Sequence, residues 1–131
     1  MSSEAESSPS KAMLWSGSIL SALVVLMLLF SGVLKIAGPA DVTKEFSRLG
    51  WPEHVALALG ILEIACAIIY AIPKTSVLGA ILLTGYLGGA IATHVRIEEL
   101  KFISPAIGGV LVWLGLYLRD AKLRALIPLR S

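Results

Sequence analysis

One carboxylate stands inside a long apolar stretch of this sequence. Glu63 lies in GILEIACAII, residues 60–69, where no neighbour carries a charge that could neutralise it. Burial disfavours the charged form of a carboxylate unless a cation or hydrogen-bond donors compensate for the lost water. Glu63 is therefore a candidate binding residue, and the alternative is a hydrogen-bonded link between helices without further function.

Polar residues in the following apolar run occur at a suitable depth to meet Glu63. With a helical rise of about 1.5 Å per residue, Tyr86 is expected at the same depth as Glu63. Thr93 lies on the same helical face as Tyr86, two turns later, and His94 is adjacent to that face. This pattern predicts a polar stripe that leads from Glu63 to one surface of the membrane.

The first apolar run adds a hydroxyl and a cation one turn apart, Ser31 and Lys35. We expect Lys35 to reach Glu63 directly or through a water molecule, and His94 and Tyr86 are the alternative partners. The predicted ligand-binding residues are Ser31, Lys35, Glu63, Tyr86, Thr93 and His94. Taken singly, Lys35 and His94 are equally well explained as residues of the membrane interface.

The composition predicts that lipid surrounds the helices that carry these residues. The chain has 131 residues, of which 56% are hydrophobic and 15% charged, and its mean hydropathy is +0.85. A helix of about 20 apolar residues crosses the hydrocarbon core. Four runs approach that length, and the last is the shortest: 15–36, 54–72, 76–95 and 102–118. We predict an all-α fold in which residues 12–120 form a bundle of four transmembrane helices.

The two ends of the sequence lie outside the four apolar runs. Residues 1–11, MSSEAESSPSK, predict a disordered tail, because they offer little apolar surface for folding. Acidic residues precede the first apolar run, unlike a secretory signal. Residues 121–131 are predicted to form a basic C-terminal tail. Six basic residues lie on the side of the tails and five on the other side, which predicts that both termini are in the cytoplasm. We expect a multi-pass protein of the bacterial inner membrane.

Small residues in the third run predict close helix packing. They recur at intervals of four from Ser76 to Ala92, and Gly85 and Gly89 form a G-x-x-x-G pattern. Such ridges let two helix backbones approach closely. We expect this ridge, which includes Gly88, to pack within the chain, and dimerisation is the alternative.

The loop 37–53, AGPADVTKEFSRLGWPE, predicts a short helix at the membrane interface. Asp41 can cap its beginning, and Val42, Phe46 and Leu49 recur at helical spacing. An amphipathic helix of this kind lies flat in the interface. It can serve as a lid over the polar residues or as an anchor without a gating role.

The motifs SGVLK (31–35), EFSRLGWP (45–52) and GGAIATHVR (88–96), together with the mid-span Glu63, resemble the DoxX-like family of small four-helix membrane proteins over about residues 15–118. The family name comes from a subunit of an archaeal thiosulfate:quinone oxidoreductase, so the resemblance implies contact with a quinone and with a redox partner protein. Other relatives are associated with oxidative-stress complexes or with membrane-protein assembly. The residues that match the family's polar pattern are Ser31, Lys35, Glu63, Thr93 and His94. Membership of a family does not by itself establish an activity.

Several other chemistries are disfavoured. Cys66 is the single cysteine, so the chain lacks the pair that thiol–disulfide exchange requires. His54 and His94, with Glu53 or Glu99, form too weak a constellation to predict a metal site. The basic residues are not interleaved with stacking aromatics, so no nucleic-acid partner is expected. No catalytic residue is assigned.

Three functional hypotheses remain. The first is a membrane subunit that holds a quinone or a similar lipophilic small molecule in an outward-facing polar pocket, within a redox complex; the quinone is the candidate cofactor, and enzymatic activity is left open. The second is a non-enzymatic assembly or interaction protein. The third, a pathway for protons or small molecules, is disfavoured because the polar residues stop near mid-membrane.

Overall fold

The computed structural model describes residues 11–52 and 54–127, and all regular elements in these ranges are helical. The elements are α2 (Lys11–Ala37), α3 (Ala40–Arg48), α4 (Val55–Ala71), η1 (Pro73–Thr75), α5 (Ser76–Arg96), η2 (Leu100–Phe102), α6 (Ile103–Arg119) and α7 (Ala121–Leu126). The predicted all-α fold is confirmed.

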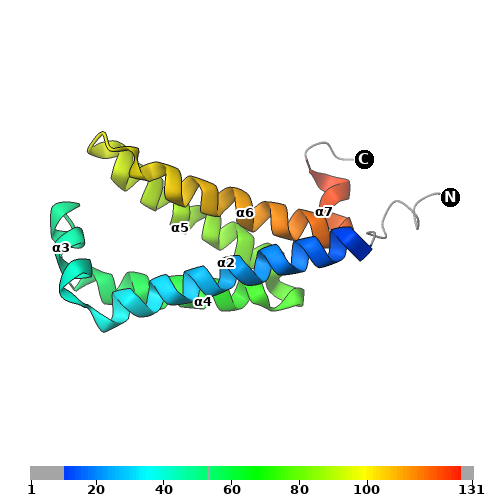
Figure 1. Cartoon of the computed structure of the whole chain (residues 1–131), viewed down its shortest axis with the longest axis horizontal. Helices are drawn as coiled ribbons and strands as arrows, with labels where there is room; N and C mark the ends of the chain where they lie inside the picture. The colour runs from blue at the N-terminus through cyan, green and yellow to red at the C-terminus, as the bar shows by residue number, and fades with distance from the viewer. Residues whose placement is uncertain (1–10, 53, 128–131) are drawn as a thin grey trace.

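The long helices form a bundle that opens at one end. Helix α2 packs against α4 and α6, and α5 packs against the same two helices. Figure 1 shows that α5 and α6 diverge from α2 and α4 toward the end at which α3 lies, whereas α7 and the first turn of α2 lie at the opposite end. We call the end with α3 the outer end and the end with α7 the inner end.

Three segments are long and apolar enough to cross a membrane by length and composition: Lys11–Ala37, Pro73–Arg96 and Leu100–Arg119. The run that is shortest in the sequence, 102–118, gains length from η2, and the segment has 20 residues. Helix α4 is apolar but has 17 residues, near the lower limit for a membrane crossing. The crossing by α4 stays a prediction.

The inner half of the bundle is tightly packed. Its largest fully buried side chains include Tyr70, Leu83, Val112 and Leu116. Gly79 makes this packing possible, because a Cβ atom added there would lie 2.4 Å from the backbone of Tyr70. Many large apolar side chains, by contrast, point outward from the bundle, as expected where helices face lipid.

The predicted small-residue ridge packs at its inner end but not at its outer end. Ser76 and Ala80 are buried, whereas a Cβ atom added at Gly85, Gly88 or Gly89 would meet no atom within 4 Å. The prediction that Gly88 packs against a helix of the same chain is therefore wrong. The physical reason is that Gly88 is exposed on the side of α5 that faces a hollow between α5 and α6.

The short elements agree with the sequence in part. The predicted helix in the first loop is α3, on which Phe46 is buried, and Leu49 is buried directly after its end. Asp41 does not cap α3, because Pro39 occupies the N-cap position and Asp41 lies in the first turn. Residues 121–126 of the predicted C-terminal tail form α7, whose N-cap is Asp120. Residues 1–10 and 128–131 of the two predicted tails lie outside the described residues.

Candidate functional site

Glu63 is the centre of a hydrogen-bonded cluster that joins three helices. Its side chain is 4% exposed, and its Oε1 atom accepts hydrogen bonds from Lys35 Nζ at 2.9 Å, Tyr86 OH at 3.1 Å and Ser31 Oγ at 3.2 Å. Lys35 Nζ also donates to Ser31 Oγ at 2.7 Å. Of the partners considered from the sequence, Lys35 pairs with Glu63 directly and Tyr86 adds a second link.

Two glycines bring α2 close enough to α4 for this pairing. A Cβ atom added at Gly60 would lie 2.7 Å from the carbonyl oxygen of Gly32 and 2.9 Å from Lys35 Cβ. The two backbones therefore approach each other closely, one turn before Glu63 on α4. Because Ser31 and Lys35 are one turn apart on α2, both can reach the same carboxylate oxygen.

All six predicted site residues line one cavity. It has a volume of about 990 Å³ and lies among α2, α4, α5, α6 and the α3 segment. Besides the polar residues, its walls include apolar side chains of every long helix, for example Leu28, Leu62 and Leu111. Gly85 and Gly89 form part of the wall, and no atom lies within 4 Å of their missing Cβ positions. Cavities of this size are typical of small-molecule sites.

Thr93 and His94 line the cavity but do not bond to Glu63. Thr93 Oγ1 donates to the Gly89 carbonyl oxygen at 2.8 Å, and His94 Nδ1 contacts a carboxylate oxygen of Glu99. The alternative prediction that His94 is the partner of Glu63 is wrong. Because α5 diverges from α4, its last turns meet the connection to α6 instead.

Ion pairs link α3 to the α5–α6 connection at the outer end of the cavity. The Arg48 guanidinium donates to both oxygens of Glu99, at 2.8 and 3.1 Å, and to both oxygens of Glu45, at 2.7 and 2.9 Å. Lys101 approaches Glu45 at 3.5 Å. Hydrogen bonds from Arg48, and next from His94, lower the pKa of Glu99 to about 2. Arg48 also lowers the pKa of Glu45.

Sequence reasoning missed a second polar network in the inner half. Tyr70 OH donates to the Val112 carbonyl oxygen at 2.6 Å and lies 3.1 Å from Ser21 Oγ. Arg119 Nε donates to Ser21 Oγ at 3.0 Å, and its guanidinium lies 5.5 Å from the centre of the Tyr70 ring. The sequence feature that could have indicated this network is Tyr70, which lies two turns after Glu63 on the same helical face.

Comparison with known proteins places the chain in a family. A search of curated proteins and a search of solved structures returned no match. The family model described as the DoxX-like family matches residues 19–115, which is more than half of the chain and includes the whole Glu63 cluster. The resemblance drawn from the sequence motifs is thus confirmed. The chain belongs to the DoxX-like family, and its apolar helices make it a multi-pass integral membrane protein that contacts the lipid bilayer.

Proposed function

We propose that this protein binds a quinone or a similar lipophilic small molecule in the cavity beside Glu63, as a membrane subunit of a redox complex. The observation that carries the proposal is the gathering of Lys35, Tyr86 and Ser31 around one carboxylate at the wall of a cavity of about 990 Å³. A few convergent polar groups in an otherwise apolar cavity are typical of ligand sites, where they fix the orientation of the ligand.

The donors and the walls fit a quinone. A quinone carbonyl accepts hydrogen bonds, and Lys35 has one N–H left for it, because Lys35 Nζ carries three and donates to Glu63 and Ser31. Tyr86 and Ser31 each have a single O–H, which they donate to Glu63, and on binding either O–H would turn from Glu63 to the quinone. The apolar side chains of Leu28, Leu62 and other lining residues suit its ring and tail. When bound, a quinone would supply reversible redox chemistry, while the residues of this chain orient its carbonyl and keep bulk water away from it.

We extend the proposal to four membrane crossings with both termini in the cytoplasm. Helix α4 packs between α2 and α5 in the bundle, so it shares their lipid environment and we assign it the fourth crossing. The first turn of α2, which begins at Lys11, and the basic helix α7 lie at the same end (Figure 1), and basic ends are retained in the cytoplasm. Helix α3 then lies at the outer interface. A reporter fused after Ser131 should be active only in the cytoplasm, and activity on the other side would reverse this orientation.

The non-enzymatic assembly role is the second candidate, because the cluster is complete without a ligand. In the part of the chain that the structure describes, no buried side-chain polar atom lacks a hydrogen-bond partner. In this alternative the cluster only fixes the helices relative to one another. The pathway hypothesis is weaker, because Cys66, Ala67 and Leu83 form a buried apolar layer between Glu63 and the Tyr70 network.

Equilibrium binding distinguishes the first two candidates. We would measure binding of decylubiquinone to the purified protein in mild detergent, together with Glu63→Gln and, as the matched control, Glu98→Gln. Glu98 is exposed in the α5–α6 connection and does not line the cavity. We expect the parent and the control to bind equally and Glu63→Gln to bind at least about tenfold more weakly, about 1.4 kcal/mol. Absence of binding to the parent would reject the quinone, and equal binding by Glu63→Gln would favour the assembly role.

A further inference from the structure

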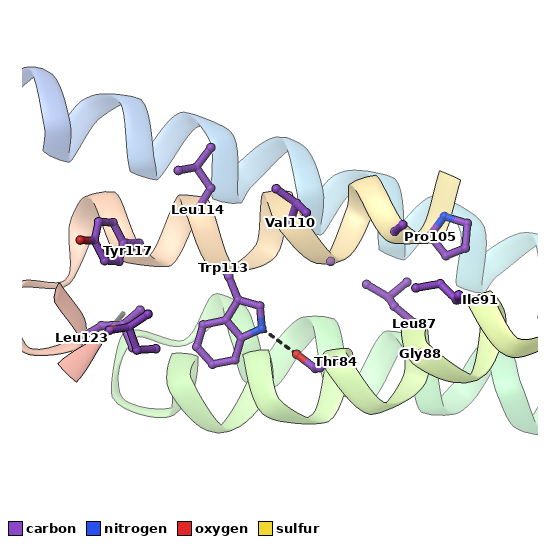
Figure 2. Close-up of a pocket in the computed structure, with 13 residues that line it drawn as sticks. Thr84, Leu87, Gly88, Ile91, Pro105, Val110, Trp113, Leu114, Tyr117 and Leu123 are labelled. Carbon is purple, nitrogen blue, oxygen red and sulfur yellow. Dashed lines mark hydrogen bonds between the residues drawn. The ribbon is translucent and has the colours of Figure 1, made fainter. Parts of the chain in front are cut away.

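A second hollow lies on the outside of the bundle between α5 and α6. Its volume is about 560 Å³, and apolar side chains such as Leu87, Ile91 and Val110 line it. Figure 2 shows Trp113 of α6 reaching across it to Thr84 of α5. Gly88 belongs to this groove, whereas Gly85 and Gly89 belong to the cavity beside Glu63. The groove and the candidate binding site thus open on different sides of α5, and they share only Leu87 and Pro105 as lining residues.

The groove is long enough for one lipid acyl chain, and it runs from near the inner end of α6 past the midpoint of that helix. It extends along α6 from Pro105 to Tyr117, which is about 18 Å at the helical rise of about 1.5 Å per residue. Half of the hydrocarbon core is about 15 Å thick. Trp113 Nε1 donates to Thr84 Oγ1 at 2.7 Å, and Thr84 Oγ1 donates to the Ala80 carbonyl oxygen at 2.7 Å. The polar side-chain atoms of Trp113 and Thr84 are thus bonded within the protein, and the apolar surface around them suits an acyl chain.

The inner end of the groove is basic. Arg124 Nη1 donates to the carbonyl oxygens of Tyr117 at 2.8 Å and Leu118 at 3.0 Å, which holds its guanidinium beside the groove residues Tyr117 and Leu123. In residues 11–52 and 54–127, no carboxylate pairs with Arg124 and no partner bonds to the Tyr117 hydroxyl. The nearby Asp120 accepts two backbone N–H bonds at the start of α7. The Arg124 guanidinium, which these hydrogen bonds hold in place, and the Tyr117 hydroxyl are therefore available to bind an anion.

We infer that this groove binds one chain of an anionic phospholipid, whose phosphate pairs with Arg124 and accepts a hydrogen bond from Tyr117 OH. A guanidinium is the side chain best suited to a phosphate. With the proposed orientation, the basic end lies in the cytoplasmic leaflet, where anionic lipids attract basic residues near the membrane surface. The site is independent of the quinone proposal, because its residues and its test do not involve Glu63.

Native mass spectrometry of the detergent-purified protein tests the site with two probes that share the same acyl chains, phosphatidylglycerol and phosphatidylcholine. We expect the parent to bind phosphatidylglycerol at least about tenfold more tightly, and Arg124→Gln to lose this preference. Gly88→Leu, whose Cβ atom would meet no atom within 4 Å, places a side chain in the groove and should bind neither probe well. Lys74→Gln, which removes an exposed inner-end charge outside the groove, is the control and should bind both probes as the parent does.

Three results would overturn the inference. The first is equal binding of both probes by the parent, and the second is unchanged binding by Gly88→Leu. The third is a dimer of the parent that Gly88→Leu converts to a monomer while lipid binding is unaffected, because the groove would then be an interface between two copies of the chain.

Discussion

Glu63 and Tyr70 lie two turns apart on the same buried face of α4, but their surroundings differ. Tyr70 is fully enclosed, and Gly79 of α5 presses against its backbone. Glu63 lies opposite a part of α5 where Gly85 and Gly89 leave open space and a cavity of about 990 Å³. The inner polar network is thus packed like a structural core, whereas the outer cluster borders a space that a ligand can enter.

The difference shows that a glycine-rich helix can serve two purposes along its length. At Gly79 the missing side chain permits close contact between α4 and α5. At Gly85, Gly88 and Gly89 it leaves hollows on two sides of α5. On α5, substitution of a glycine is therefore expected to cost much stability in the inner half and little in the outer half.

The largest expected effect is that of Gly79→Ala. The new Cβ atom would lie 2.4 Å from backbone atoms of Tyr70, so the helices must separate at a cost of about 3 kcal/mol or more. Gly85→Ala, which meets no atom within 4 Å, should instead be neutral or stabilising by up to about 1 kcal/mol, because alanine favours the helix. Thermal melting in detergent measures both. Similar melting temperatures for the two variants would refute the packing difference.

The next effect concerns the Lys35–Glu63 ion pair. Lys35→Met leaves the buried Glu63 carboxylate with hydroxyl donors alone, and we expect it to lower the free energy of unfolding by about 2 kcal/mol. The loss is smaller than for a fully buried pair, because the Lys35 side chain is 19% exposed. Adding Glu63→Gln should recover part of the loss, with a coupling energy of about 1 kcal/mol or more. Melting of the parent, the two single variants and the double variant tests this. Strictly additive losses would mean that the pair is not coupled.

Substitution of Tyr70 should mainly lower stability, and substitution of Tyr86 should mainly weaken quinone binding. Tyr70→Phe removes the bonds to Val112 and Ser21 and should cost about 1–2 kcal/mol, because a buried carbonyl loses its donor. Tyr86→Phe leaves Glu63 with Lys35 and Ser31, so it should cost less than about 1 kcal/mol in stability but weaken quinone binding. Melting and equilibrium binding of both variants provide the comparison. The reverse order of stability losses would contradict the account.

The smallest effect is the pH dependence of the outer charges. Arg48 lowers the pKa of Glu99 to about 2 in the folded protein. A lowered carboxyl pKa stabilises the fold above the unfolded-state value, about 4.3, and this contribution disappears as the pH falls toward 2. The bridge is exposed, so the effect should be small. The melting temperature of Arg48→Gln should therefore approach that of the parent between pH 5 and pH 2.5. A constant difference between the two would argue against this ion pair.

The sequence predicted the cluster better than the packing around it. A lone acid in an apolar run signals that donors must approach, and helical depth indicated Tyr86 and Lys35. The sequence could not predict that α5 diverges from α4, because small residues at intervals of four are compatible with close contact or with open space. For the same reason it placed His94 near Glu63 and missed its contact with Glu99. The inner network was missed because Tyr70 and Ser21 are ordinary residues of apolar helices until their partners are known.

The central claim is that the space beside Glu63 is a ligand site, and a ligand-induced melting shift tests it most directly. Saturating decylubiquinone should stabilise the parent, by about 2.7 kcal/mol at a hundredfold excess over Kd. Gly88→Leu, which fills the external groove, should keep that shift, whereas Gly89→Leu, which fills the cavity, should lose it. Both glycines have open space at their missing Cβ positions, and the melting temperatures without ligand, which we expect to be close to that of the parent, check that both variants fold. A full shift in Gly89→Leu, or a loss confined to Gly88→Leu, would contradict the account.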